Sequence, residues 1–307
     1  MVINMEIAAE SCIEAIKAVN GYLRGAGMSI TRRSGSWCMM KNPQTEMLEL
    51  HNVLITIKNP LQRWHSLLTR GILLETLDYM LGNNPGYVAK WYKIYQEYSA
   101  ETGQLPYSYG QRIFGSPTEI NQWEKVVELL RVHPTTRQAC IVIHRPIDRV
   151  RTFVPCTYVF HFQVTKDNFT GENKLEMTSV MRSQDAYRGL PLDLFAWTTL
   201  HEQMSLETGI PLGEYHHFVC NLHYYKKDIE DATEAISNAK VTRVSRPAEL
   251  FTKKIKAKTR KLLKHNLTWL DVRDAKLNDG EILEFIKGTD KYWKDYVKLL
   301  VGGKLLD

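Results

Sequence analysis

The stretch that most constrains the fold of this chain is MRSQDAYRGLPLD, residues 181–193. It ends a segment in which apolar and polar residues alternate, 174–182, and it leads into a segment with apolar residues at helical spacing, 193–207. Alternation predicts a strand, and helical spacing predicts a helix. We therefore expect a strand, a turn and a helix in succession, which brings an arginine, a hydroxyl and two carboxylates to one corner of the fold.

The same two periodicities predict the other elements. Helices are expected over 7–24, 61–81, from 116 to about 131, and 193–207, and strands over 49–58, 139–144, 157–164, 174–182 and 214–225. Residues 116–119, SPTE, combine a capping box with a proline at the first helical position, so they mark a helix start. Together these elements predict a mixed α/β chain, and periodicity alone does not give its topology.

Composition argues against a membrane protein and against a disulfide-rich secreted protein. Of the 307 residues, 44% are hydrophobic and 24% are charged, as in ordinary soluble domains. The chain has no apolar run of about eighteen residues and no basic N-terminal region followed by an apolar core. Its five cysteines are odd in number and widely spaced, which predicts free thiols in a reducing compartment. We therefore expect a cytoplasmic protein without a membrane partner.

The net charge of +6 is concentrated late in the chain, in residues 253–264, KKIKAKTRKLLK. A mildly basic protein suits anionic ligands such as nucleotides. A solvated helix face explains the lysine run better than binding to nucleic acid does, although both interpretations stay open.

Several residues have side chains suited to chemistry. Cys156 follows a proline at a strand start, and a nearby arginine would favour its reactive thiolate, although a lone buried cysteine is more often structural. Glu75 lies among apolar positions of a predicted helix, where a carboxylate is costly unless it is paired or functional. Residues 31–36, TRRSGS, predict a basic turn whose N–H groups suit a phosphate, although many surface turns look the same.

Three histidines raise the question of a metal, namely His216, His217 and His223. No cysteine or glutamate stands at the ligand spacing that a zinc site needs, so we expect no metal. His161 is interpreted as a packed strand histidine.

Three motifs follow one another in the second half of the chain. They are Pro-Cys-Thr at 155–157, RSQD with GLPLD within 182–193, and His-Tyr-Tyr at 223–225. In this order they resemble the thymidylate synthase family. The resemblance implies an α/β fold of the α+β type, with a large mixed β-sheet covered by helices and a sheet face that forms a homodimer interface.

The resemblance covers roughly residues 30–230 and fades from about residue 246. We therefore expect a catalytic domain over 1–245 and a basic helical extension over 246–307 that packs on the same domain.

The resemblance also implies a reaction and the residues that perform it. In this family a cysteine thiolate adds to C6 of a pyrimidine nucleotide, and C5 then takes a one-carbon unit from 5,10-methylenetetrahydrofolate, without a metal. The catalytic residues implied are Cys156, Glu75, Tyr109 and Asp193. Those implied to bind the nucleoside monophosphate are Arg33 (or Arg32), Arg137, Gln138, Arg182, Ser183, Asp193, His223 and Tyr225. Those implied to bind the folate are Asp185, Gly189, Glu75 and Tyr95.

Two departures from the family pattern concern the phosphate and the folate. Arg137 and Gln138 stand where the family has two adjacent arginines that reach into the phosphate site of the partner subunit. Gln138 therefore removes one charge and keeps a hydrogen-bonding group. Tyr95 and Tyr98 stand where the family usually has tryptophans that shield the reacting methylene from water.

The third departure concerns the base, because Asp193 replaces the usual asparagine after GLPL. An asparagine amide offers one donor and one acceptor, which match O4 and N3–H of uracil. An ionised aspartate only accepts, so it matches the N4 amino group of cytosine and a protonated N3. Against uracil it would leave a buried mismatch that costs about 1–3 kcal/mol.

Asp193 and Thr157 together resemble the branch of the family that hydroxymethylates cytidylates. We therefore predict a (deoxy)cytidylate 5-hydroxymethyltransferase that acts on CMP or dCMP, and the sequence does not separate ribose from deoxyribose. Phage DNA modification and nucleoside-antibiotic synthesis are equally compatible. The alternatives are a thymidylate synthase, with Asp193 merely capping the helix that it starts, and a non-catalytic binder of nucleotides or nucleic acid.

Overall fold

The computed structural model describes residues 5–33, 44–82, 108–116, 119–150, 154–167, 170–242, 250–252, 255–257, 292, 293 and 296. These residues belong to two compact units, one formed by 1–68 with 125–245 and the other by 69–124 with 246–307. The division into 1–245 and 246–307 expected from the sequence stays a prediction.

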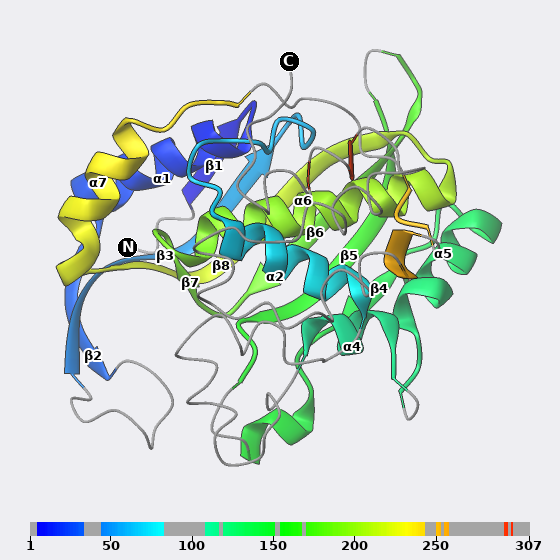
Figure 1. Ribbon diagram of the computed structural model, residues 1–307, viewed down its shortest axis with the longest axis horizontal. Helices are drawn as coiled ribbons and strands as arrows, with labels where there is room; N and C mark the ends of the chain where they lie inside the picture. Colours follow the sequence, from blue (N-terminus) through cyan, green and yellow to red (C-terminus); the bar gives the residue numbers. More distant parts are fainter. Residues whose placement is uncertain are drawn as a thin grey trace, which may run out of the picture. The chain divides into compact units, whose positions relative to one another are not determined.

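The first unit is built on one mixed sheet (Figure 1). Its strands run in the order β1-β3-β8-β6-β5-β4, while β2 pairs with β3 and β7 pairs with β8. The pairs β1–β3, β6–β8 and β7–β8 are parallel and the others are antiparallel. The strands are β1 Met5–Ala9, β2 Met28–Arg33, β3 Gln44–Ile57, β4 Cys140–Val142, β5 Thr157–Lys166, β6 Asn173–Met181, β7 Gln184–Asp185 and β8 Leu212–Tyr225. The prediction of a mixed α/β fold with a large mixed sheet is confirmed.

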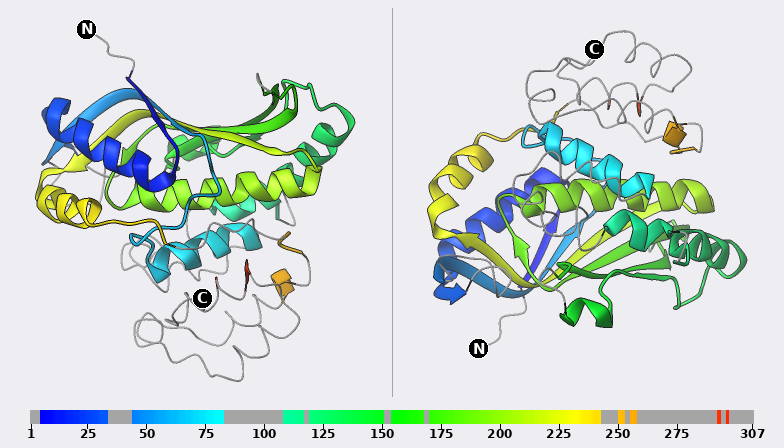
Figure 2. Two further views of the ribbon diagram at one scale, coloured as in Figure 1. Left: turned by 90° about the horizontal axis from the view of Figure 1, so that it is seen from above. Right: turned by 60° about the horizontal axis from the view of Figure 1, so that its bottom comes forward.

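Two helices cover one face of this sheet, α1 (Cys12–Ala26) and α6 (Gly189–Thr208) (Figure 2). Helix α1 packs on β1 and β3 and also contacts α7 (Ile229–Ser237), while α6 packs on β6 and β8. Helix α6 is buried on all sides between Leu194 and Ser205. A helix enclosed in this way holds its position firmly, because every side of it is packed against other parts of the core.

The opposite face of the sheet carries no helix among the described residues of this unit (Figure 2). Along β6 and β8, every second residue is only half-buried. Those residues are Lys174, Glu176, Thr178 and Val180 on β6, and Glu214, His216, Phe218 and Cys220 on β8. The sequence predicted that a face of the sheet forms a dimer interface without saying which face, and that stays a prediction.

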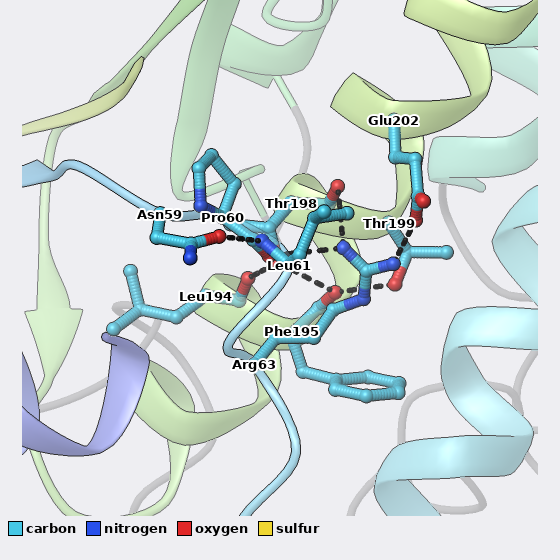
Figure 3. Close-up of polar contacts among 9 residues, drawn as sticks. All are labelled: Asn59, Pro60, Leu61, Arg63, Leu194, Phe195, Thr198, Thr199 and Glu202. Atoms are coloured by element: carbon cyan, nitrogen blue, oxygen red, sulfur yellow. Dashed lines mark hydrogen bonds and ion pairs between the residues drawn. The ribbon is translucent and has the colours of Figure 1, made fainter. Parts of the chain in front are cut away.

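A buried ion pair anchors the chain after β3 on helix α6 (Figure 3). The guanidinium of Arg63, which is fully buried, pairs with the carboxylate of Glu202. It also donates to the carbonyl oxygens of Pro60, at 3.0 Å, and Thr198, at 3.3 Å. Two of these three partners of Arg63, Thr198 and Glu202, lie on α6, so Arg63 fixes the helix at its middle turns.

The first predicted helix begins later than expected. Residues 7–24 were expected to be helical, but residues 5–9 form β1 and the helix begins at Cys12. Strand β1 pairs in parallel with β3, from Met5 opposite Val53 to Ala9 opposite Ile57. Pairing with a strand more than forty residues away in the sequence overrides the local helical spacing.

The helix expected over 61–81 is confined to α2, Arg70–Leu81. Thr69 caps it, and its hydroxyl oxygen accepts from the N–H of Ile72 at 3.3 Å. The residues before Thr69 instead form the non-helical segment that contains Arg63. The observed start of α2 is therefore the Thr69 cap, six residues after Arg63.

The turn and the capping box predicted from the sequence are also corrected. Residues 31–33 are not a turn, because they form the end of β2, where Arg33 pairs with Gln44. Residues 116 and 119 form a short bridge, and α5 (Gln122–Val132) starts later. The side chain of Asn121 accepts from the N–H of Glu124 at 3.1 Å and caps that helix.

The second unit contains α2 and the short helix α4, Tyr109–Phe114. Gly110 allows their close approach, because a Cβ on this residue would lie 2.7 Å from the carbonyl oxygen of Tyr79. The hydroxyl of Tyr296 donates to the carbonyl oxygen of Leu73 at 2.6 Å, so the C-terminal part of the chain also packs on α2. In the part of the chain that the structure describes, no helix is long and apolar enough to cross a membrane.

Candidate active site

The strand–turn–helix corner predicted around residues 181–193 is present. Strand β6 ends at Met181, opposite Val219, and β7 resumes at Gln184, opposite Leu222. The register to β8 is the same on both sides, so Arg182 and Ser183 occupy a two-residue interruption in one ladder. An interruption next to a continuous strand lets these two residues turn toward a neighbouring loop.

Arg182 holds the loop that carries Cys156. Its Nε donates to the carbonyl oxygen of Pro155 at 3.0 Å, and its Nη2 donates to that of Val154 at 2.9 Å. Its backbone N–H donates to the carbonyl oxygen of Cys156 at 2.8 Å. The arginine of the corner and the cysteine of the earlier motif are thus brought together, although more than twenty residues separate them in the sequence.

The thiol of Cys156 is harder to ionise than the sequence suggested. Burial raises its pKa above the ordinary value, and the negative charge of Asp193 raises it further. The guanidinium of Arg182 acts in the opposite direction and does not overcome burial. The expectation that an arginine would favour the thiolate is confirmed in direction, because Arg182 lowers the pKa of Cys156, but burial of the thiol outweighs this effect and the pKa stays above its ordinary value.

Asp193 lies inside helix α6 and not at its start. The helix begins at Gly189 after Arg188, which occupies the cap position without a capping hydrogen bond from its side chain. Asp193 is the fifth residue of the helix, so the interpretation of this aspartate as a helix cap is wrong. Its charge acts on the pKa values of Cys156 and of the buried Tyr215, which places the carboxylate close enough to influence both groups.

Asp185 makes the turn that starts α6 early. Its Oδ1 accepts from the backbone N–H groups of Tyr187, at 2.8 Å, and Arg188, at 3.2 Å. Gly189 then packs against Gln184, because an added Cβ would lie 2.6 Å from the Nε2 of that side chain. Sequence reasoning did not single out Gln184, although its place inside the RSQD motif was a signal.

His223 and Tyr225 reach the same corner from β8. His223 pairs with Asp185 in the ladder, and its Nδ1 lies 3.1 Å from Oδ1 of Asn221. Burial lowers the pKa of His223 more than the carboxylates of Asp185 and Glu49 raise it, which favours a neutral ring. The rings of His223 and Tyr225 meet edge to face, with centroids 5.1 Å apart.

The second unit holds two further predicted residues, Glu75 and Tyr109. Glu75 is buried on α2, and its Oε1 accepts from the hydroxyl of Tyr79 at 2.5 Å. The ring of Tyr79 in turn contacts that of Tyr109, with centroids 5.3 Å apart. Asp78, the neighbouring carboxyl on α2, was not singled out from the sequence, although it lies only three residues after Glu75.

The structure does not bring every predicted residue to the corner. Arg137 and Gln138 are exposed just before β4, the edge strand of the sheet, and the N–H of Gln138 donates to Thr136 Oγ1 at 3.1 Å. The backbone of Arg33 ends β2, and its side chain lies outside the described residues, as does that of Arg32. Tyr95 and Tyr98 also lie outside them.

The histidines considered for a metal have other partners. His216 lies 3.6 Å from Glu176 and 3.2 Å from the hydroxyl of Thr56, and the pKa of Glu176 is lowered to about 2, chiefly by His216. His217 lies 2.7 Å from the hydroxyl of Ser179, and burial lowers its pKa to about 3. No group of three or more potential ligands with metal-binding geometry occurs within the described ranges.

Comparison with known proteins gives two findings. A family model described as thymidylate synthase matches residues 32–287. A thymidylate synthase of Listeria monocytogenes is 24% identical over 166 residues, which make up 51% of this chain and 51% of that protein. The chain therefore spans about half the length of this curated relative.

Proposed function

Because the chain belongs to the thymidylate synthase family, we propose that it transfers a one-carbon unit from 5,10-methylenetetrahydrofolate to C5 of CMP or dCMP. The product is the 5-hydroxymethyl nucleotide, and tetrahydrofolate leaves unoxidised. The observation that carries this proposal is the position of Asp193. It stands where the family usually has asparagine, it lies inside α6, and its charge acts on the thiol of Cys156.

The carboxylate of Asp193 explains the choice of base. It belongs to the fifth residue of α6 and acts electrostatically on Cys156, so we assign it to the base of a nucleotide bound at that cysteine. An ionised carboxylate accepts hydrogen bonds from N4 of cytosine and from N3 when N3 is protonated. Protonation of N3 also lets the ring absorb charge when the sulfur attacks C6. Uracil presents the carbonyl oxygen O4 in place of the amino group. O4 and a carboxylate oxygen of Asp193 both accept hydrogen bonds, so neither would find a donor.

The reaction proceeds through a covalent adduct. Sγ of Cys156 bonds to C6, and C5 attacks the methylene carbon of the folate. Loss of the proton from C5 and cleavage of the carbon–nitrogen bond to tetrahydrofolate leave an exocyclic methylene on the ring. Water adds its oxygen to this methylene and gives up a proton, and Sγ leaves C6 as the thiolate. Burial raises the pKa of Cys156, so the thiol has to give up its proton before its sulfur can attack C6. Glu75 is assigned to the proton transfers.

The remaining predicted residues hold the two substrates. Phosphate binding is assigned to Arg33, Arg182 and Ser183, with Arg137 and Gln138 contributed by a second subunit, since charge-assisted bonds suit a phosphate. The sugar is assigned to His223 and Tyr225, and the neutral ring favoured for His223 has a donor and an acceptor for a hydroxyl. The folate is assigned to Asp185, Gly189, Glu75 and Tyr95.

A homodimer follows from the assignment of Arg137 to the partner's site. The half-buried face of β6 and β8 supports it, because no described helix of that unit covers this surface. We assign the protein to a reducing compartment such as the cytoplasm, since the reaction needs a free thiol at Cys156.

Product mass tests the proposal directly. The purified protein is incubated with methylenetetrahydrofolate and, separately, with CMP, dCMP and dUMP. A hydroxymethyl-sized gain on one cytidylate supports the proposal and identifies the sugar. A methyl-sized gain on dUMP with formation of dihydrofolate would make the protein a thymidylate synthase. No product, together with salt-dependent binding to DNA or RNA, would favour the non-catalytic binder.

A further inference from the structure

Glu75 has a second carboxyl group beside it on helix α2. Asp78 follows it by three residues, a spacing at which helical side chains are neighbours. Both side chains are buried, with 3% of Glu75 and 5% of Asp78 exposed. Two carboxyl groups this close cannot both ionise cheaply away from water, so one of them keeps its proton to a higher pH than the other.

Hydrogen bonding distinguishes the two groups. The hydroxyl of Tyr79 donates to Oε1 of Glu75 at 2.5 Å, which favours the ionised form of that carboxylate. Oδ1 of Asp78 has no hydrogen-bond partner among the described residues. Burial and then the charge of Glu75 raise the pKa of Asp78 to about 8. These contacts favour the protonated form of Asp78 and the ionised form of Glu75.

Other elements of the same unit hold this pair in place. Helix α4 contributes Tyr109, whose ring contacts that of Tyr79, and the buried Arg112. A Cβ on Gly110 would lie 3.1 Å from the carbonyl oxygen of Asp78, so α4 lies directly against the backbone of the pair. The buried Tyr296 of the same unit donates to the carbonyl oxygen of Leu73, two residues before Glu75 on α2.

We propose that Asp78 is the second titrating carboxyl of the Glu75 site. The two carboxyls together hold one proton near neutrality, and that proton resides on Asp78 while Glu75 is ionised under the Tyr79 hydroxyl. Glu75 is the carboxylate of the pair that takes up a proton, and Asp78 is the carboxyl that releases one. Because the charge on each group changes the pKa of the other, Asp78 sets the pH range in which Glu75 exchanges protons. Asp78 is a positioning residue that acts through Glu75, and the proposal rests on the proton-transfer role assigned to Glu75.

The protonation state is tested on the full-length protein without any substrate. Carbon-13 NMR of protein labelled at the aspartate carboxyl carbons, recorded across a pH series, identifies Asp78 by the signal that the Asp78→Asn variant lacks. We expect this signal to titrate near pH 8. An Asp78 that is already ionised in mildly acidic buffer would overturn the proposal. Because no turnover is needed, this result stands apart from whether the proposed reaction is right.

A second variant tests the coupling between the two carboxyls. Glu75→Gln removes the neighbouring charge, so the titration of Asp78 should move to lower pH and stay above that of an ordinary aspartate, because burial remains. An unchanged titration in Glu75→Gln would mean that the carboxyls do not share a proton. This measurement uses native Asp78 and therefore does not depend on the folding of the Asp78→Asn variant.

Activity supplies the third test. In the wild-type protein we expect the pH profile of kcat/KM to show a limb near pH 8. Asp78→Asn keeps the shape of the protonated acid and cannot titrate, so this limb should disappear. If the limb persists in Asp78→Asn while NMR finds Asp78 protonated, the carboxyl is structural only.

Discussion

At the scale of single residues, ionisation in this protein is decided by burial before it is decided by charge. Cys156 has an arginine beside it and nevertheless has a raised pKa. Asp78 has a raised pKa first because it is buried and second because Glu75 is charged. His223 has a lowered pKa despite two carboxylates that oppose the shift. Burial is the largest cause in all three cases: it outweighs opposing charges at Cys156 and His223, and at Asp78 it acts in the same direction as the charge of Glu75.

The substitution Asp193→Asn tests this reasoning at Cys156. Removing the negative charge while keeping the shape should lower the pKa of Cys156. The rate at which iodoacetamide alkylates Cys156, followed by mass spectrometry of its peptide across a pH series, measures the change. Asp185→Asn is the matched control, because it keeps the Oδ1 that makes the turn and should leave Cys156 unaffected. Identical pH profiles for Asp193→Asn and the wild type would contradict the expectation.

The same variant should change the choice of base. An amide offers one donor as well as one acceptor, so Asp193→Asn should shift the preference from cytidylate toward uridylate by roughly 5- to 150-fold, the range that corresponds to about 1–3 kcal/mol of mismatch. Competition between dCMP and dUMP, read by product mass, measures the shift. A variant that keeps the full preference for cytidylate would remove Asp193 from the reading of the base.

The raised pKa of Asp78 predicts how stability depends on pH. The folded protein binds a proton that the unfolded chain loses near its ordinary aspartate pKa, so this contribution is full in acid and is lost as pH rises toward about 8. The slope should approach 1.4 kcal/mol per pH unit at most, about the value for one proton. Urea unfolding of the wild type and of Asp78→Asn at several pH values gives the difference. We expect the wild type to lose free energy of unfolding relative to Asp78→Asn as pH rises toward about 8. A difference in free energy of unfolding that stays constant across this range would contradict a protonated Asp78.

At the scale of elements, the position of helix α6 determines the geometry of the corner. The Asp185 turn sets where the helix begins, and the Arg63–Glu202 pair fixes it between three and four turns later (Figure 3). Asp185 and Arg63 both lie outside residues 193–207, the segment whose helical spacing predicted the helix. They explain why Asp193 faces the region of Cys156 from inside the helix.

Breaking the Arg63–Glu202 pair should destabilise the protein strongly. Glu202→Gln leaves a buried guanidinium without its counter-charge, which costs about 3–5 kcal/mol. Denaturant unfolding measures this loss. The exposed pair Lys125–Glu128 is the control, since Glu128→Gln should cost less than about 1 kcal/mol. Similar losses for the two variants would show that the buried pair does not anchor α6.

At the scale of the whole molecule, the proposed reaction needs two copies of the chain. Arg137 and Gln138 lie before the edge strand β4, away from the corner that holds Cys156. The proposed dimer assigns them to the phosphate site of the partner. The half-buried face that includes Phe218 is the surface proposed to join the copies.

Mixing two inactive variants tests this arrangement. Arg137→Ala and Cys156→Ala should each have little activity alone. After the two are unfolded and refolded together, the mixed dimers should contain one site with an intact Cys156 and an intact arginine from the partner. Recovered activity in the mixture, and none after mixing without refolding, is the expected result. No recovery, although mixed dimers are seen by mass spectrometry, would contradict a shared site.

The sequence by itself determined the elements whose signals are local. The strands around 49–58, 157–164, 174–182 and 214–225 and the body of the helix at 193–207 are present, because alternation and helical spacing record which side of an element is buried. The motifs that place Cys156 and Arg182 in one corner could also be recognised from the sequence.

Only the tertiary structure decided the features that depend on partners distant in the chain. It made residues 7–9 part of a strand instead of a helix through pairing with β3, and it confined the helix expected over 61–81 to residues 70–81. It placed Asp193 inside its helix and raised the pKa values of Cys156 and Asp78. The burial of a side chain and the electrostatic field around it depend on all the groups that surround it in space. Those groups come from distant parts of the chain, so local sequence patterns do not specify them.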